Sequence, residues 1–263
     1  MTAEAARRLL AEVAERYRET LGENLIGLYE HGSLAFGCFE WSVSDIDFLV
    51  VVKREPTLPE KKRLIGILLE RLNDAPQKGF EMSVVLGKHL RPFVYPTPFE
   101  LHYSNAHLPA CRKDAEAYCM GMNGTDRDLA AHCTVIRAVG RRVTGEAVGK
   151  VFGEVPREDY LDSICFDVEG AKEDILENPV YVTLNLCRVL AAVRENRVLS
   201  KKEGGEWACR ALDKRWEKLI RQALAAYAGG REPDKEEALF FAEHMLPQIN
   251  NEIKTSVTWR KRT

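Results

Sequence analysis

Asp45 and Asp47, two carboxylates at the start of an apolar segment, are candidates for a metal-binding or catalytic role. Side chains alternate between the faces of an extended strand, so positions 45 and 47 point the same way, about 7 Å apart. Carboxylates on one face repel each other unless a cation lies between them, and Mg²⁺ prefers oxygen ligands. The pattern indicates a divalent-metal site, although S-D-I-D could also be a helix cap or a turn entering a strand.

A Gly-Ser pair, Gly32 and Ser33, precedes the carboxylates and directly follows another apolar segment. Backbone N–H groups in such a turn, together with the serine hydroxyl, can hold the oxygens of a phosphate chain. Hard cations also bind substrate phosphates. The order of strand, Gly-Ser turn, short helix and carboxylate-bearing strand therefore favours a site for a metal-bound phosphate compound.

Glu81 is the third candidate carboxylate, at the second position of the segment F-E-M-S-V-V-L. A buried, unpaired glutamate is costly, so this position needs an explanation. Glu81 is either an edge-strand charge that discourages aggregation, or it joins Asp45 and Asp47 across the sheet. In the second case it could take the proton from an attacking hydroxyl group.

The periodicity of apolar residues and the helix-capping motifs predict the helices and strands around these carboxylates. A helix is expected at 2–21, strands at about 25–31, 45–53 and 80–86, and a helix from the Thr57 capping box to about 73. Residues 88–124 include the closely spaced prolines Pro92, Pro96 and Pro98 and are expected to be irregular. Helices are expected thereafter at 125–139, 159–176, 180–196, 200–212, 215–227 and 234–253.

The fold class predicted from this order is α+β, with a mixed sheet and flanking helices followed by an all-helical region. At 263 residues the chain is long enough for two ordinary domains. We place the first at 1–154 and the second at 155–263.

Charge and composition exclude several classes of function. A net charge of −2 gives no strong basic field for a polyanion, which argues against a nucleic-acid partner. No apolar segment approaches the roughly 20 residues that span a bilayer. The seven cysteines are odd in number and form no C-x-x-C pair, which fits reduced thiols. We expect a cytoplasmic monomer that binds neither membrane nor nucleic acid.

Two sets of motifs resemble known families. G-S-x-x-x-G followed by S-D-I-D-F-L-V-V-V resembles the signature of the nucleotidyltransferase superfamily shared with DNA polymerase beta. Most of the chain is similar to the aminoglycoside adenylyltransferases that modify streptomycin and spectinomycin. That similarity rests on E-x-x-V-V from Glu81, V-T-L-N-L-C-R at 182–188, S-K-K-E-G-G-E-W-A at 200–208 and A-A-Y at 225–227.

The resemblance implies an enzyme that transfers AMP from ATP to a hydroxyl of a cationic antibiotic, with about two Mg²⁺ ions. It implies that Asp45, Asp47 and Glu81 hold metal, with Glu81 also the catalytic base. The implied nucleotide-binding residues are Gly32, Ser33, Ser44, Asp45, Asp47, Arg188, Lys201 and Tyr227. Read without the resemblance, Arg188 could pair with Glu169 or Glu173, Lys201 could be solvated, and Tyr227 could belong to the core.

The motifs say less about the residues that would bind the acceptor than about those that would bind ATP. An acidic cleft is expected for a polycation, and the candidate substrate-binding residues are Glu81, His102, Asp174, Glu177 and Asn178. The chain lacks the tryptophan that the best-known family members use against streptomycin, and Asn178 stands where those members have an aspartate. Alternatives are transfer to another small molecule or a protein, and a non-catalytic, antitoxin-like interaction module.

Overall fold

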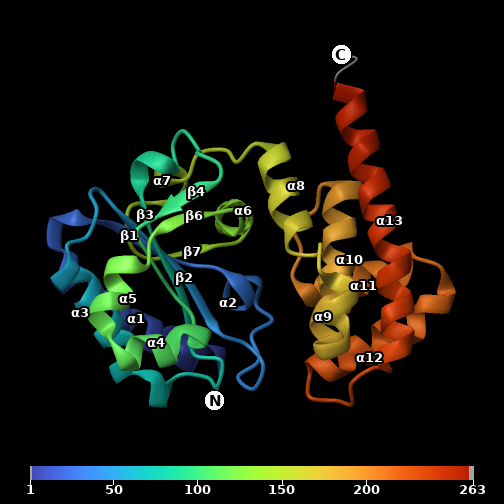
Figure 1. Cartoon of the computed structure of the whole chain (residues 1–263), viewed down its shortest axis with the longest axis horizontal. Helices are drawn as coiled ribbons and strands as arrows, with labels where there is room; N and C mark the ends of the chain where they lie inside the picture. Colours follow the sequence, from blue (N-terminus) through green and yellow to red (C-terminus); the bar gives the residue numbers. More distant parts are fainter. Residues whose placement is uncertain (1, 261–263) are drawn as a thin grey trace. The chain divides into compact units, whose positions relative to one another are not determined.

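The computed structural model describes residues 2–260 and their side chains as far as Lys254. The chain divides into two compact units, Met1–Asp159 and Tyr160–Thr263. The division predicted from the sequence, at 154/155, lies slightly earlier in the chain. Strands occur in the first unit, and the second is built from helices (Figure 1). The predicted α+β class is confirmed. Within residues 2–260, no helix combines the length and apolar character needed to cross a membrane.

A five-stranded mixed sheet forms the centre of the first unit. Its order is β5-β3-β2-β1-β7, in which β2 and β3 are parallel and the other neighbours are antiparallel. A second, small sheet pairs β4 with β6. The strands are β1 (Leu25–Glu30), β2 (Ile46–Val52), β3 (Phe80–Leu86), β4 (Thr97–Phe99), β5 (Leu101–Tyr103), β6 (Gly124–Asp126) and β7 (Arg141–Gly145).

Each face of the larger sheet has its own hydrophobic core. Phe48 and Val50 of β2 belong to the core that includes residues of helices α1 (Ala3–Leu21), α3 (Leu58–Glu70) and α5 (Ala115–Gly121). Leu49 and Val51 belong to the other core, with residues of α6 (Asp128–Ala138) and α7 (Val148–Val151). Because side chains alternate along a strand, position 47 shares the α6 side with 49 and 51.

Local sequence signals explain several element boundaries. Thr57 caps α3 in a capping box with Glu60, as predicted, and Pro59 stands in the first turn.

The prediction that residues 88–124 are irregular is wrong. This segment contains β4, β5, α4 (Leu108–Lys113) and α5. Strands of three residues are too short to show alternation, so their formation depends on pairing with β3 and β6 rather than on local pattern.

The second unit packs its helices around α10 (Pro179–Glu195), which contacts four others. Pro179 takes the first helical position, where its missing N–H costs nothing. The single helix expected at 159–176 is wrong, because the chain is interrupted before Gly170, the N-cap of the next helix. The remaining helices are α8 (Arg157–Phe166), α9 (Ala171–Glu177), α11 (Lys201–Ala211), α12 (Glu217–Tyr227) and α13 (Lys235–Arg260).

Candidate active site

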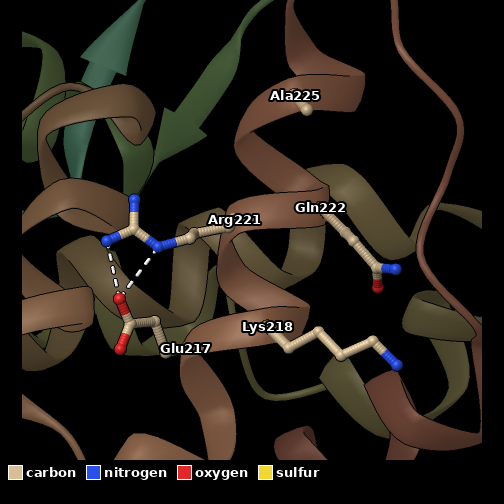
Figure 2. A pocket seen from close by; sticks show the side chains of 5 residues that line it. All are labelled: Glu217, Lys218, Arg221, Gln222 and Ala225. Atoms are coloured by element: carbon tan, nitrogen blue, oxygen red, sulfur yellow. Dashed lines mark hydrogen bonds and ion pairs between the residues drawn. The ribbon is translucent and has the colours of Figure 1, made fainter.

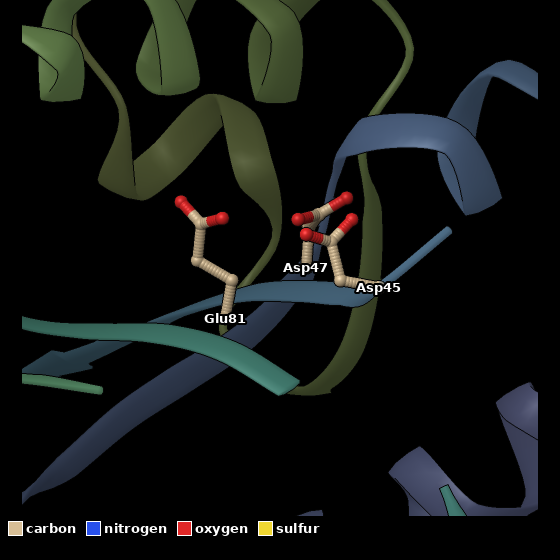
Figure 3. A group of neighbouring side chains, drawn as sticks. All are labelled: Asp45, Asp47 and Glu81. Carbon is tan, nitrogen blue, oxygen red and sulfur yellow. The ribbon is translucent and has the colours of Figure 1, made fainter. Parts of the chain in front are cut away.

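Three carboxylates converge at the edge of the sheet where β2 and β3 begin. One oxygen from each of Asp45, Asp47 and Glu81 lies within 4.8 Å of the other two. Figure 3 shows all three side chains pointing to the same side of the strands. The sequence prediction that Glu81 meets the two aspartates across the sheet therefore agrees with the geometry. Its alternative, an isolated edge charge, does not describe this position.

Strand register brings the carboxylates together. Asp47 and Glu81 are direct partners in the parallel pairing of β2 with β3. Asp45 stands one residue before β2, on the same side as Asp47. Asp47 is 9% exposed, while Asp45 and Glu81 are half-buried. The site thus has one enclosed and two accessible acidic groups.

The Gly-Ser turn packs directly on this cluster. Gly32 begins the short helix α2 (Gly32–Phe36) with a φ of 58°, in the left-handed region. A Cβ atom at Gly32 would lie 1.8 Å from Oδ2 of Asp47. The backbone N–H of His31 also donates to the carbonyl oxygen of Asp47, at 3.1 Å. A glycine is required here because the aspartate carboxylate occupies the space of a side chain.

Ser33 presents a hydroxyl group at the same turn. Its Oγ is buried and has no hydrogen-bond partner in the protein. Buried polar groups are nearly always paired, so this hydroxyl is available to a ligand such as a phosphate oxygen. A hollow of about 510 Å³ adjoins the cluster, lined by Asp45 together with Ser42, Lys78, Asn105 and neighbouring residues.

The donor set fits a hard divalent cation. Mg²⁺ binds oxygen at 2.0–2.1 Å, so two of its octahedral ligands are about 3 Å apart when adjacent and about 4 Å apart when opposite. The three carboxylate oxygens lie within 4.8 Å of one another, which is near this range. Three acidic groups at this separation also repel one another, which a cation would relieve.

Ser44 is placed differently from the other predicted residues of this loop. It is 4% exposed, and its Oγ accepts a hydrogen bond from the backbone N–H of Glu40 at 3.1 Å. The hydroxyl therefore holds the turn that leads into Asp45. A contact between Ser44 and a nucleotide stays a prediction.

Two histidines that sequence reasoning assigned no role adjoin the cluster. His132 of α6 brings Nε2 to 4.0 Å from Oε1 of Glu81. Its ring lies against that of His31, with centroids 4.6 Å apart. Burial, with a smaller effect of His132, holds the pKa of His31 well below its usual value. No sequence pattern connects His132 to Glu81, because they come from separate elements.

His102, a predicted substrate contact, lies on β5 opposite Ser83. Its Nδ1 is 2.9 Å from Oγ of Ser83. Burial is the main reason that the pKa of His102 falls to about 4, and nearby His107 adds to the effect. Ser83 and Glu81 share one face of β3, so His102 is close to the cluster. A direct contact with substrate stays a prediction.

Arg188, in the second unit, belongs to a hydrogen-bonded group on one side of α10. Its Nε donates to Oδ1 of Asn185 at 2.6 Å, and Nη2 lies 3.6 Å from Oδ2 of Asp167. Asn185 donates to the same Asp167 oxygen at 2.8 Å. The internal carboxylate beside Arg188 is thus Asp167, whereas the sequence suggested Glu169 or Glu173. The guanidinium side chain remains 30% exposed, so it can also bind an anion.

Lys201 and Tyr227 occupy helix ends in the second unit. Lys201 begins α11, behind a Ser200–Glu203 capping box that confirms the predicted helix start. Its Nζ lies 4.3 Å from the ring centroid of Tyr181. Tyr227 is the last residue of α12. The same helix lines a hollow of about 540 Å³, with Glu217, Lys218, Arg221, Gln222 and Ala225 (Figure 2).

The predicted acidic substrate contacts lie on α9, where Asp174 belongs to the first turn and Glu177 is the last residue. Asp174 and Glu177 are exposed, and so is Asn178, which separates α9 from α10. These two exposed acids and the amide give this part of the second unit the acidic character expected for a cation-binding surface. Their contact with an antibiotic stays a prediction.

A mixed sheet with a Gly-Ser turn packed on carboxylates of adjacent strands is the arrangement expected from the resemblance to nucleotidyltransferases. Comparison with known proteins narrows the class. Residues 150–248 match the family model described as aminoglycoside adenylyltransferase, C-terminal domain. This part of the chain therefore corresponds to the C-terminal domain of the aminoglycoside adenylyltransferases, the enzymes that its motifs resemble.

Relatives extend this similarity over nearly the whole chain. An aminoglycoside (3'') (9) adenylyltransferase from Escherichia coli is 24% identical, covering 95% of this chain and 97% of its own. One of the same name from Klebsiella pneumoniae is also 24% identical, over 95% and 94%. The crystal structure of spectinomycin adenyltransferase AAD(9) from Enterococcus faecialis, with ATP and spectinomycin, has the same fold. Its TM-score is 0.77 at 19% identity, with coverage of 92% and 98%.

Proposed function

We propose that this chain transfers AMP from ATP to a hydroxyl group of an aminoglycoside-type antibiotic and thereby gives resistance to the drug. The observation that carries the proposal is the convergence of Asp45, Asp47 and Glu81 within 4.8 Å, beside the Gly-Ser turn. Relatives named for adenylyl transfer to aminoglycosides support the reaction, and the similar structure with ATP and spectinomycin supports donor and acceptor.

In the proposed reaction the acceptor hydroxyl oxygen attacks the α-phosphorus of ATP. Glu81 takes the proton of that hydroxyl as its oxygen–phosphorus bond forms. The bond between the α-phosphorus and the oxygen bridging to the β-phosphate breaks, and pyrophosphate leaves. Half-burial of Glu81 keeps its carboxylate accessible to an acceptor.

We propose that Asp45 and Asp47 hold about two Mg²⁺ ions, with Glu81 as a further ligand. When bound, Mg²⁺ would neutralise the triphosphate and stabilise the leaving pyrophosphate. The chain's own contribution is positioning: Gly32 admits the Asp47 carboxylate, and Ser33 offers its unpaired hydroxyl to a phosphate oxygen. Ser44, Arg188, Lys201 and Tyr227 complete the proposed nucleotide-binding set.

For the acceptor, spectinomycin is favoured over streptomycin. The chain has no tryptophan between positions 42 and 206, and Asn178-Pro179 replaces the aspartate of streptomycin-modifying members. A similar solved structure contains spectinomycin. His102, Asp174, Glu177 and Asn178 are the proposed acceptor contacts besides Glu81.

The test is AMP transfer from labelled ATP to a panel of antibiotics, with and without Mg²⁺. The panel contains spectinomycin, streptomycin, other aminoglycosides and a lincosamide. We expect Mg²⁺-dependent labelling of spectinomycin by the wild type. We expect no labelling by the Asp47→Ala variant, provided that its circular dichroism spectrum matches that of the wild type. Labelling only of the lincosamide, or of a protein, would replace the proposed acceptor. A protein that labels no acceptor but captures a stable partner would favour the interaction-module alternative.

A further inference from the structure

Glu81 has a neighbour besides the two aspartates. We infer that His132 is a positioning residue that holds the Glu81 carboxylate in place for proton transfer, an inference that rests on the proposed function. His132 Nε2 lies 4.0 Å from Glu81 Oε1. This separation exceeds a hydrogen bond, but contacts of catalytic groups are often long without substrate and tighten when it binds.

A donor beside Glu81 would oppose the effects that can displace its carboxylate. The side chain has three rotatable bonds and is 32% exposed, so an added contact at its carboxylate restricts the rotamers open to it. Asp45 and Asp47 repel its carboxylate whenever no cation lies between them. An N–H group beside Oε1 opposes both effects, since a donor to a carboxylate fixes its orientation.

His132 is itself held by the turn that packs on Asp47. Its ring lies against His31 at a centroid separation of 4.6 Å and an interplanar angle of 34°. His31 is 4% exposed and is bonded through its backbone N–H to Asp47. The His132 imidazole that faces Glu81 therefore packs against His31, the residue before Gly32. Direct contacts thus connect the Gly-Ser turn to His132, and His132 to Glu81.

The other ring nitrogen indicates which tautomer faces Glu81. Nδ1 of His132 is buried and has no hydrogen-bond partner. A buried N–H without an acceptor is rarer in proteins than an acceptor without a donor. In the tautomer with its proton on Nε2, that N–H group faces Glu81 and Nδ1 is left as the unpaired acceptor. This arrangement gives His132 an orienting role and no part in proton transfer to substrate.

Three variants test the role, measured by kcat, by KM for ATP and by thermal unfolding. His132→Ala removes the donor, His132→Gln keeps an N–H group, and His89→Ala is a matched control from the η3 turn (Gly87–His89). We expect His132→Ala to lower kcat about 10- to 100-fold, the usual loss for residues that orient a ligand. KM for ATP should stay within about twofold, His132→Gln should recover most of kcat, and His89→Ala should match the wild type.

Two results would overturn the inference. One is a kcat for His132→Ala within twofold of the wild type. The other is an equal loss in His132→Ala and His132→Gln with matching falls in unfolding temperature, which would mean a purely structural role. A double variant adds a further check: in a Glu81→Gln background His132→Ala should cause no additional loss.

Failure of this inference can be told apart from failure of the proposed function. If Glu81→Gln retains AMP transfer, the proposed role of Glu81 is wrong. If Glu81→Gln is inactive and His132→Ala is fully active, only the inference about His132 fails.

Discussion

Asp47 and Glu81 are register partners on two neighbouring parallel strands, so the backbone itself sets the spacing of the two carboxylates. Adjacent strands lie about 4.8 Å apart, which is also the reach over which the three acidic groups of the site converge. A shift of the pairing by one residue would turn one carboxylate to the opposite face and disassemble the site. The apolar residues that follow each carboxylate, buried in two cores, hold this register.

Glu81→Gln should separate nucleotide binding from transfer. The amide cannot accept the hydroxyl proton, so we expect the rate of AMP transfer to fall about 10²- to 10⁴-fold. The size and register of the residue are kept, and ATP affinity measured by calorimetry should change little. Asp47→Ala is the comparison: it removes a metal ligand and should weaken binding of ATP with Mg²⁺. Loss of ATP binding in Glu81→Gln as well would make Glu81 chiefly a metal ligand.

Gly32→Ala should inactivate the enzyme through Asp47. The added methyl group would meet Oδ2 of Asp47 at 1.8 Å, on a residue whose φ of 58° already disfavours alanine. We expect AMP transfer to be lost together with roughly 1–2 kcal/mol of the free energy of unfolding. Gly37 is the matched control, because its φ is 72° and a Cβ atom added there would have no other atom within 4 Å.

The Gly37→Ala variant should lose similar stability and keep its activity. Full activity in Gly32→Ala would show that the close packing of the turn on Asp47 does not matter for catalysis. Chemical denaturation gives the free energies of unfolding, and labelled ATP gives the rates.

The sequence predicted the elements around the carboxylates well because their signals are local. The strand at 80–86 has its expected bounds, and both capping boxes form. Prediction from the sequence failed where an element forms only by pairing with residues far away in the chain. The strand β7 is an example: it contains two arginines and no apolar alternation, and it forms because β1 offers an open edge. The break before Gly170 likewise left little trace within a polar, helix-forming stretch.

At the site, the residues visible in the sequence were those that lie in motifs. Asp45, Asp47 and Glu81 could be found because each interrupts or precedes an apolar strand. His132 could not, since its nearness to Glu81 depends on how α6 crosses the sheet. Asp167 was missed because it lies in the turn after α8 while its partner Arg188 lies on α10, and the sequence suggested Glu169 or Glu173 instead.

Arg188→Ala should raise KM for ATP if the arginine binds nucleotide. A charge-assisted hydrogen bond contributes about 1.5–3 kcal/mol, which corresponds to roughly a 10- to 100-fold change in KM with a smaller effect on kcat. Asp167→Asn is the matched control, because it weakens the internal network and keeps the guanidinium. If Arg188 only stabilises that network, both variants would lower the unfolding temperature and leave KM unchanged.

The stability of the protein should fall with acid between pH about 6.5 and 4, in part because of His102. The pKa of His102 is lowered from 6.5 to about 4 in the folded state, mainly by burial. Between these values the unfolded chain binds a proton that the folded chain does not, so the free energy of unfolding rises with pH. The stabilisation is complete above pH 6.5 and amounts to roughly 3 kcal/mol.

His102→Gln removes this titration, so its unfolding free energy should vary less steeply than that of the wild type over the same range. His31, whose pKa is also lowered by burial, contributes in the same direction but is present in both proteins. The difference between the two profiles therefore isolates His102. Urea denaturation at half-unit steps from pH 4 to 7.5 gives both curves. Parallel curves would mean that protonation of His102 is not opposed by the fold, in spite of its contact with Ser83.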